Sequence, residues 1–379
     1  MSCDPLPTST PESRPPGLPA GVPPLTTFYL YLTTGCNLRC RHCWIAPTFT
    51  DGEPAPGEYL DLVLLRRAVE EAKPLGLHAA KLTGGEPILH PHFVEVVDLL
   101  TAAGLALNME TNGTLLTADL ARHLKEKTNL DDVSVSLDGP TPAVHDPFRG
   151  VEGAFDAAVQ GVRHLVAAGY RPQIIMCPHR GNVQYIEDMV ELAVQLGAGS
   201  VKFNPVMRSG RGVALHDHGE ALDFEEVLDL MRFVRGSLQQ RAPIRLFLST
   251  PLAFYTVREL LAGGPAGMCH VRHILGILGS GEMALCGIGR TVAELCFGNL
   301  RDTSVADAWL QHPVLRQLRE DLDGDYPGMC GTCIHAKRCL TYCVAQNYLD
   351  SGRLVSPAWL CAEADRRGVF PASRRREGP

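Results

Sequence analysis

Apolar residues follow two alternating spacings from Thr26 onward, which predicts alternating strands and helices. Short apolar runs typical of buried strands lie at Thr27–Thr33, Ala79–Leu82, Ala106–Glu110, Asp132–Leu137, Gln173–Cys177 and Ser200–Asn204. Apolar residues three or four positions apart predict helices at Asp61–Lys73, Phe93–Ala103, Thr117–Lys127, Ala154–Ala168 and Tyr185–Leu196. Repeated strand–helix units with short loops imply parallel strands and right-handed crossovers. The pattern therefore predicts an α/β fold, a partial barrel of six strands that is open on one side.

The residues before and after these strand–helix units do not continue the same alternation. A helix at Phe224–Gln239 and a strand at Ile244–Leu248 are expected to close the barrel, and one further helix is expected at Val305–Leu322. Met1–Pro24 is rich in Pro, Ser, Thr and Gly, so we expect it to be disordered. We accordingly divide the chain into a tail (1–24), a barrel (25–255), a small second domain (256–365) and a basic tail (366–379).

Composition narrows the class of protein. The chain has 379 residues, 45% of them hydrophobic, and a net charge of −7, which argues against a nucleic-acid-binding surface. No secretory signal and no apolar run of about 20 residues is present, so we expect a cytoplasmic protein that does not enter a membrane. In such a compartment, thirteen cysteines favour metal ligation over disulfides.

Three of these cysteines form a compact motif directly after the first predicted strand. Cys36, Cys40 and Cys43 have the spacing Cys-x3-Cys-x2-Cys. Thiolates this close bind a soft metal centre, either zinc or an iron–sulfur cluster. Structural zinc takes four ligands, but no fourth Cys lies nearby and His42 is adjacent to Cys43. A [4Fe–4S] cluster held by three cysteines would leave one iron open.

With His42 directly before its third cysteine, the motif resembles the signature of the radical S-adenosylmethionine (SAM) superfamily. The resemblance implies a TIM-like partial (βα)6 barrel and a cluster held by Cys36, Cys40 and Cys43. SAM would chelate the open iron and be cleaved reductively to a 5′-deoxyadenosyl radical, which abstracts a hydrogen atom from the substrate.

Polar motifs also follow the other predicted strands, so all of them should lie on one rim of the barrel. Gly84-Gly85-Glu86 matches the family motif that contacts the SAM amino group, with glycines allowing close approach, although such a stretch can also be an ordinary turn. Ser136 and Asp138 could contact the ribose or carboxylate of SAM. Asn112 is equally compatible with a turn, and Arg149 with an exposed arginine at a helix start. The expected SAM contacts are therefore Gly84, Gly85, Glu86, Asn112, Ser136, Asp138 and Arg149.

Cys177 ends the fifth predicted strand and could point into the cavity. A thiol there could donate a hydrogen atom to a substrate radical, as the resemblance to peptide epimerases implies. The alternative, which we favour, is a small buried apolar side chain.

The remaining cysteines resemble the SPASM extension, an auxiliary-cluster domain of many peptide-modifying radical SAM enzymes. The family pattern implies one fully ligated [4Fe–4S] cluster and a second auxiliary cluster with three ligands. Cys296 or another group could complete the second, or one iron could stay open. A zinc ribbon is the competing interpretation. The implied ligands are Cys330, Cys333, Cys339 and Cys361 for the first cluster, and Cys269, Cys286 and Cys343 for the second.

The resemblance implies modification of a ribosomally made precursor peptide by crosslinking, epimerisation or oxidation. We expect no fused leader-recognition domain, hence a possible separate leader-binding protein, and flavodoxin or ferredoxin as electron donor. Two other functions stay open, namely radical processing of a small molecule or tetrapyrrole side chain and a non-catalytic zinc-binding protein.

Overall fold

The computed structural model describes residues 14–50, 55, 58–261 and 269–376. Within these ranges ten strands form one sheet in the order β12-β11-β10-β1-β4-β5-β6-β7-β8-β9, and β2 (Gly35–Cys36) pairs separately with β3 (Thr48–Phe49). All neighbouring pairs from β1 to β9 are parallel. These strands are β1 (Thr27–Tyr31), β4 (Ala79–Thr83), β5 (Ala106–Thr111), β6 (Leu130–Ser136), β7 (Gln173–Met176), β8 (Ser200–Phe203) and β9 (Arg245–Leu248). The predicted partial barrel is confirmed, with β9 as an additional parallel strand at its edge.

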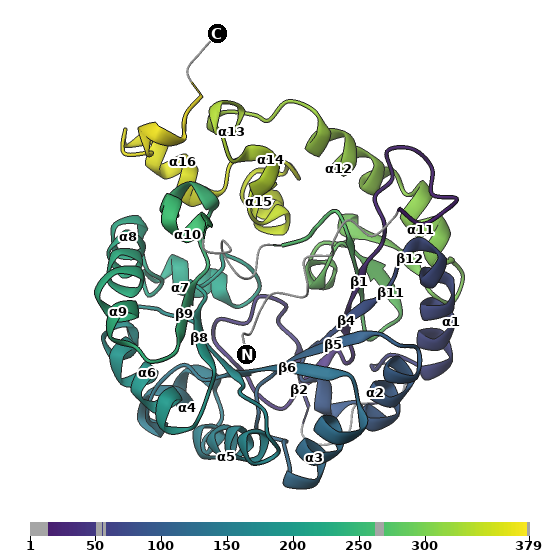
Figure 1. The fold of residues 1–379 in the computed structure, drawn as a ribbon, viewed down its shortest axis with the longest axis horizontal. Coiled ribbons are helices and arrows are strands. Elements are labelled where there is room, and N and C mark those ends of the chain that lie inside the picture. The colour runs from purple at the N-terminus through teal and green to yellow at the C-terminus, as the bar shows by residue number, and fades with distance from the viewer. Residues whose placement is uncertain (1–13, 51–54, 56–57, 262–268, 377–379) are drawn as a thin grey trace.

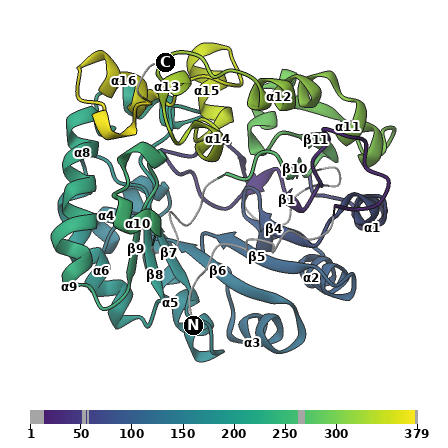
Figure 2. The same cartoon turned by 45° about the horizontal axis from the view of Figure 1, so that its top comes forward.

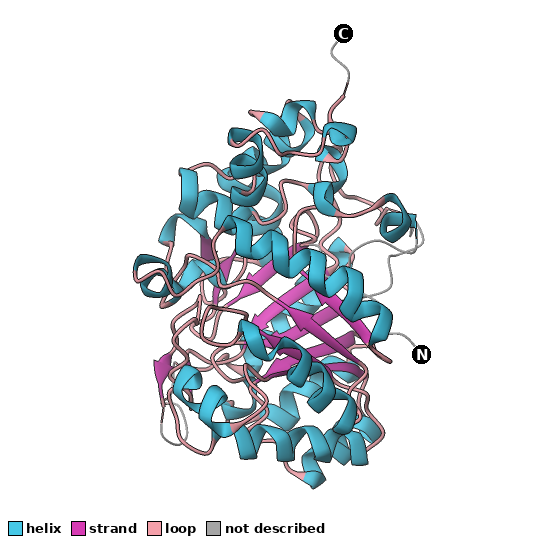
Figure 3. Ribbon diagram, turned by 90° about the vertical axis from the view of Figure 1, so that its left-hand side faces the viewer, coloured by secondary structure: helices cyan, strands magenta, loops and turns pink. Residues whose placement is uncertain are grey.

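Helices surround the outside of the curved sheet (Figure 1). Figure 3 shows the same arrangement from the side, with helices in cyan and strands in magenta. The longer helices bury an apolar stripe against the sheet; α1, for example, buries Leu65, Ala68, Val69 and Ala72 at helical spacing. Because these helices cover the outer face of the sheet, strand residues that point toward them, such as Phe28 and Leu30, are fully buried. The barrel helices are α1 (Leu62–Ala72), α2 (Phe93–Ala102), α3 (Ala118–Lys127), α4 (Pro142–Arg149), α5 (Ala154–Ala167), α6 (Ile186–Gln195), α7 (Gly212–Asp217), α8 (Phe224–Phe233), α9 (Gln239–Arg241) and α10 (Val257–Leu261).

The sheet continues beyond the barrel into the C-terminal domain. Strand β10 (Ile274–Ile277) pairs in parallel with β1, and β11 (Glu282–Ala284) and β12 (Cys296–Asn299) extend it antiparallel. The short helices that follow lie above the open end of the arc in Figure 2. They are α11 (Val305–Gln311), α12 (Pro313–Asp323), α13 (Met329–Thr332), α14 (Ala336–Cys339), α15 (Val344–Ser351) and α16 (Trp359–Arg366). The proposed boundary near residue 255 therefore separates two regions that share one sheet.

Two expectations about the ends and helices need correction, and the basic tail has a defined structure as well. The helix expected at 305–322 is two helices, because Pro313 cannot continue the first one and begins the second. The tail expected at 1–24 is folded from residue 14 onward, since the Trp309 indole donates to Pro23 O at 3.0 Å; residues 1–13 lie outside the described part. The basic tail is likewise folded to Arg376, and its Phe370 is buried.

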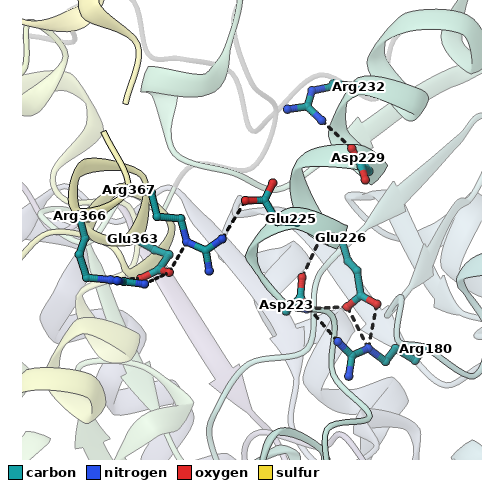
Figure 4. A network of polar contacts seen from close by, with 9 residues as sticks. All are labelled: Arg180, Asp223, Glu225, Glu226, Asp229, Arg232, Glu363, Arg366 and Arg367. Atoms are coloured by element: carbon teal, nitrogen blue, oxygen red, sulfur yellow. Dashed lines mark hydrogen bonds and ion pairs between the residues drawn. The ribbon is translucent and has the colours of Figure 1, made fainter. Parts of the chain in front are cut away.

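Ion pairs join the last helix to the barrel. Figure 4 shows Arg367 of the α16 end between Glu363 and Glu225, the latter on α8, with an Nη1–Oε1 distance of 2.8 Å to Glu225. These side chains are exposed to solvent, so each pair contributes little to the stability of the fold. Among the described helices, none combines the length and apolarity that crossing a membrane requires.

Candidate functional site

The three cysteines of the Cys-x3-Cys-x2-Cys motif line one cavity of about 700 Å³. Their loop follows β1 and is held by the end of α4, since Arg39 N donates to Arg149 O at 3.0 Å and Arg41 N to Phe148 O at 2.9 Å. Backbone anchoring of this kind fixes the loop without using the thiols. The structure thus brings Cys36, Cys40 and Cys43 together at the carboxyl end of β1, as the sequence predicts.

The charge state of these thiols tests whether an iron–sulfur cluster fits. Burial, together with Glu86 and the neighbouring cysteines, raises the pKa of Cys36 to about 12, and burial also raises that of Cys40. Two buried thiols that resist ionisation need a cationic centre to become ligands. A cluster supplies that charge, so the donor set fits it.

Gly84 and Gly85 follow β4 and pack against this loop. Gly84 has φ +145°, and a Cβ on Gly85 would lie 1.7 Å from the carbonyl oxygen of Gly35. A backbone hydrogen bond also joins the two loops, because Glu86 N donates to Gly35 O at 3.0 Å. In the structure, close contact with the cysteine loop explains why glycine is needed at these positions. The sequence interpretation explained the glycines instead by the close approach of SAM.

Glu86 is 1% exposed yet lies on the cavity wall. Its carboxylate accepts hydrogen bonds from Thr111 Oγ1 at 2.6 Å, Asn112 N at 2.8 Å and Ile88 N at 3.4 Å. Burial nevertheless raises its pKa to about 7, because three donors do not replace the lost water. A ligand ammonium would complete its coordination.

Asn112 lines the same wall but binds the protein. Its Nδ2 donates to Asn37 Oδ1 at 2.8 Å and lies 3.9 Å from Cys36 Sγ, while its Oδ1 accepts from Thr114 N at 2.9 Å. These contacts hold the cysteine loop to the end of β5. Contact of Asn112 with SAM stays a prediction.

Ser136, Asp138 and Arg149 lie near the end of β6 and at the end of α4. Ser136 and Arg149 line the cavity. Asp138 is 0% exposed and is not among the lining residues; its Oδ1 accepts from Cys177 N at 2.7 Å and its Oδ2 lies 2.8 Å from Arg149 Nε. The expected contact of Asp138 with SAM is therefore replaced by a contact with Arg149. Arg149 is the last residue of α4 and 5% exposed, so the alternative of an exposed arginine at a helix start is wrong.

Cys177 lines the cavity and also packs against Phe148, Leu215 and Ala221. Burial and the Asp138 carboxylate raise the pKa of its thiol well above the usual value, so the thiol keeps its hydrogen. Both interpretations of Cys177 therefore stay open.

His42 of the cysteine motif stacks on Phe148, with ring centroids 4.4 Å apart, and Phe148 stacks on His179 at 4.1 Å. Burial lowers the pKa of His42 to about 3, so its ring is neutral. Its 3.9 Å approach to Asp138 is for this reason not an ion pair. The stack packs the cysteine loop against α4.

The C-terminal cysteines form two separate groups. Cys269, Cys286 and Cys343 line the same cavity as the first motif, whereas Cys296 is not among its lining residues and donates to Gly289 O at 3.5 Å. Cys296 is therefore not placed to complete the three-cysteine group. The four cysteines assigned to the fully ligated cluster line a second, small cavity, namely Cys330, Cys333, Cys339 and Cys361.

Sequence reasoning missed a charged group inside the barrel. Lys81 Nζ on β4 lies 2.6 Å from Glu110 Oε1 on β5, and both line the cavity. Tyr29 lies beneath the ammonium, and burial raises the pKa of this tyrosine to about 12. A charged residue within each strand was the available signal, since an inward position in a barrel strand is normally apolar.

Comparisons with known proteins agree with this geometry. The model of the radical SAM superfamily matches residues 30–193, and that of SPASM, an iron–sulfur cluster-binding domain, matches residues 269–334. An AdoMet-dependent heme synthase of Nitratidesulfovibrio vulgaris is 31% identical over 89% of this chain and 92% of its own length. The mycofactocin maturase MftC of Mycobacterium tuberculosis is 28% identical over 92% of this chain and 85% of its own.

Solved structures share the fold. Streptococcus suis SuiB bound to precursor peptide SuiA aligns with a TM-score of 0.68 at 15% identity, over 89% of this chain and 76% of SuiB. Native anSMEcpe with bound AdoMet aligns with a TM-score of 0.68 at 15% identity, over 90% of this chain and 95% of that protein. The chain belongs to the radical SAM superfamily, carries a C-terminal SPASM domain, and binds SAM and [4Fe–4S] clusters.

Proposed function

We propose that this protein modifies a ribosomally made peptide by abstracting hydrogen from an unactivated C–H bond. The observation that carries the proposal is the shared cavity, into which both the SAM-type cysteines and the three-cysteine group of the SPASM domain open. A substrate held between these groups would meet the radical source on one side and an auxiliary cluster on the other. The similarity to the maturase MftC supports a peptide as that substrate.

Polar groups on the cavity wall suit a peptide backbone. Gln346 of α15 is 8% exposed and lines the cavity, and its Nε2 donates to Asp350 Oδ1 at 2.8 Å. Its Oε1 is buried and has no hydrogen-bond partner within the described residues. Such an acceptor is costly to bury unless a ligand N–H reaches it. A peptide amide is the donor that we propose for it.

The protein's own residues would hold and orient the cofactor. In the proposed complex Cys36, Cys40 and Cys43 bind the SAM-type cluster, Glu86 binds the SAM ammonium, and the remaining expected contacts are Gly84, Gly85, Asn112, Ser136 and Arg149. The bound cofactor supplies the radical chemistry, and the protein supplies position and a cavity wall. Asp138 would act through Arg149.

The SPASM cysteines would hold two further clusters. We propose that Cys269, Cys286 and Cys343, which line the shared cavity, would hold one auxiliary cluster. Cys330, Cys333, Cys339 and Cys361 would fully ligate the other. The zinc-binding alternative gains no support, because the chain belongs to the radical SAM superfamily.

A tetrapyrrole is the second candidate substrate. The specific observation for it is the 31% identity to a heme synthase over 92% of that relative, against 28% for the peptide maturase. The two candidates predict the same cofactor site and differ only in what enters the cavity.

Anaerobic reconstitution followed by mass spectrometry tests both candidates. The enzyme is incubated with SAM, reduced flavodoxin or ferredoxin, and either a short peptide encoded beside its gene or a tetrapyrrole, with Cys36→Ala as the inactive control. Loss of two hydrogens from the peptide is expected for crosslinking or oxidation. A peptide mass that is unchanged in H2O, with deuterium uptake in D2O, indicates epimerisation and favours Cys177 as the hydrogen donor. Conversion of the tetrapyrrole alone overturns the peptide proposal.

A further inference from the structure

A buried guanidinium contacts one thiol of the SAM-type motif. Arg149 lies at the carboxyl end of α4 and is 5% exposed, and its Nη1 donates to Cys40 Sγ at 3.6 Å. The same residue fixes the loop through its carbonyl, which accepts from Arg39 N. The side-chain contact therefore adds a charge to a loop that the backbone already positions.

Asp138 holds this charge in place. Its Oδ2 lies 2.8 Å from Arg149 Nε in an ion pair that is not an aligned hydrogen bond, and its Oδ1 accepts from Cys177 N at 2.7 Å. Burial opposes ionisation of Asp138, yet the charge of Arg149 brings the carboxyl pKa below its usual value. The aspartate is thus anchored to the end of β7, and the guanidinium is anchored to the aspartate.

A fixed cation beside a thiolate ligand changes the energy of an electron on a cluster. Reduction adds negative charge, and a nearby positive charge or an N–H···S hydrogen bond stabilises that state. The effect is large in a buried site, where the effective dielectric is low.

We propose that Arg149, anchored by Asp138, is a positioning residue that raises the reduction potential of the SAM-binding cluster through its contact with Cys40. Because Cys36, Cys40 and Cys43 are taken as the cluster ligands, this proposal rests on the proposed function. It assigns the Arg149–Asp138 pair a role in electron uptake that is separate from any contact with SAM.

EPR-monitored redox titration of the reconstituted full-length protein, first without SAM, tests the proposal. Arg149→Gln is expected to shift the midpoint potential of the SAM-type cluster to a more negative value. Arg149→Lys keeps the charge and is expected to restore most of the shift. Asp138→Asn removes the opposing charge and is expected to shift the potential to a more positive value.

Two further variants distinguish the proposed effect on the potential from misfolding and from non-specific charge effects. The double variant Asp138→Asn with Arg149→Gln leaves no unpaired buried charge and is still expected to have a more negative potential than the wild type. Arg211→Gln is the matched control, because Arg211 Nε donates to the carbonyl of Cys40 at 2.8 Å and not to its sulfur. Its shift is expected to be smaller.

The outcomes separate the two levels of the proposal. Absence of a cluster signal in the wild type would refute the ligand assignment and with it the proposed function. A normal cluster whose potential is unchanged in Arg149→Gln and in the double variant would overturn the role of Arg149 alone. A shift in Arg211→Gln equal to that of Arg149→Gln would overturn the role of the sulfur contact.

Discussion

At the scale of single residues, burial decides the properties of Glu86. Three hydrogen-bond donors and a place on the cavity wall would suit an ionised carboxylate, but the pKa of Glu86 is raised to about 7 by the loss of water. The folded protein therefore binds this proton more tightly than the unfolded chain does. The stability contributed by the neutral form is complete below about pH 4.5 and is lost as the pH rises through 7.

SAM affinity should have the opposite pH dependence if Glu86 binds the ammonium group. The carboxylate must be ionised for this contact, so affinity is expected to weaken by up to about tenfold per pH unit below pH 7. Glu86→Gln should bind SAM more weakly at pH 8 and show little change between pH 6 and pH 8. Equilibrium binding of SAM to the reconstituted protein measures this, and an unchanged pH profile in the variant would contradict the role of Glu86.

The site residues differ in how far the sequence could place them. Motif spacing brought Cys36, Cys40, Cys43 and Glu86 to one wall, because strand ends of a parallel sheet share an edge. It could not show that Asp138 faces Arg149, since that contact depends on where α4 ends. Lys81 and Glu110 were missed because one polar residue within a strand does not reveal its partner across the sheet.

At the scale of elements, the close contact between two loops determines the site. The turn after β4 lies directly on the loop after β1, with Gly85 against the carbonyl of Gly35. Only backbone atoms are involved, so neither side can move without disturbing strand pairing. Strands β1 and β4 are neighbours with five paired positions, which fixes the distance between the loops.

Gly85→Ala is therefore expected to be severely disruptive. A methyl group 1.7 Å from a backbone oxygen must displace one of the two loops, at a cost of about 1–3 kcal/mol or more. Gly236→Ala is the matched control, because its added Cβ meets nothing within 4 Å, and it should be neutral or slightly stabilising. Urea unfolding and iron content after reconstitution are the measurements. Equal stability and iron content in both variants would contradict the packing explanation.

The predicted strands and helices were accurate where the hydrophobic periodicity was strong. The prediction failed where contacts between distant parts of the chain determine the structure. The strands at 79–82 and 106–110 end within one residue of β4 and β5. The sequence did not reveal that β10 pairs with β1, because these strands are separated by most of the chain. Nor did it place α4, a short helix with Pro147 inside it that the hydrophobic pattern does not mark.

At the scale of the molecule, the pairing of β10 with β1 explains why two cysteine groups share a cavity. Cys36 follows β1, while Cys269 precedes β10 and Cys286 follows β11, so cysteines of both groups flank neighbouring strands of the sheet. Cys343 joins them from the start of α15. The ion pairs of Arg367 in Figure 4 hold α16 against the barrel, although their exposure makes them weak. The sheet itself is the main connection.

The two groups should nonetheless be separable by mutation, because they come from different elements around the cavity. Replacing Cys36, Cys40 and Cys43 together by Ala is expected to abolish SAM cleavage and remove about four irons of about twelve per chain. Replacing Cys269, Cys286 and Cys343 should remove a similar amount of iron but leave reductive SAM cleavage without substrate measurable. Iron analysis and chromatography of 5′-deoxyadenosine distinguish the two. Loss of SAM cleavage in both variants, with both proteins folded, would show that the cavity needs both clusters to form the SAM site.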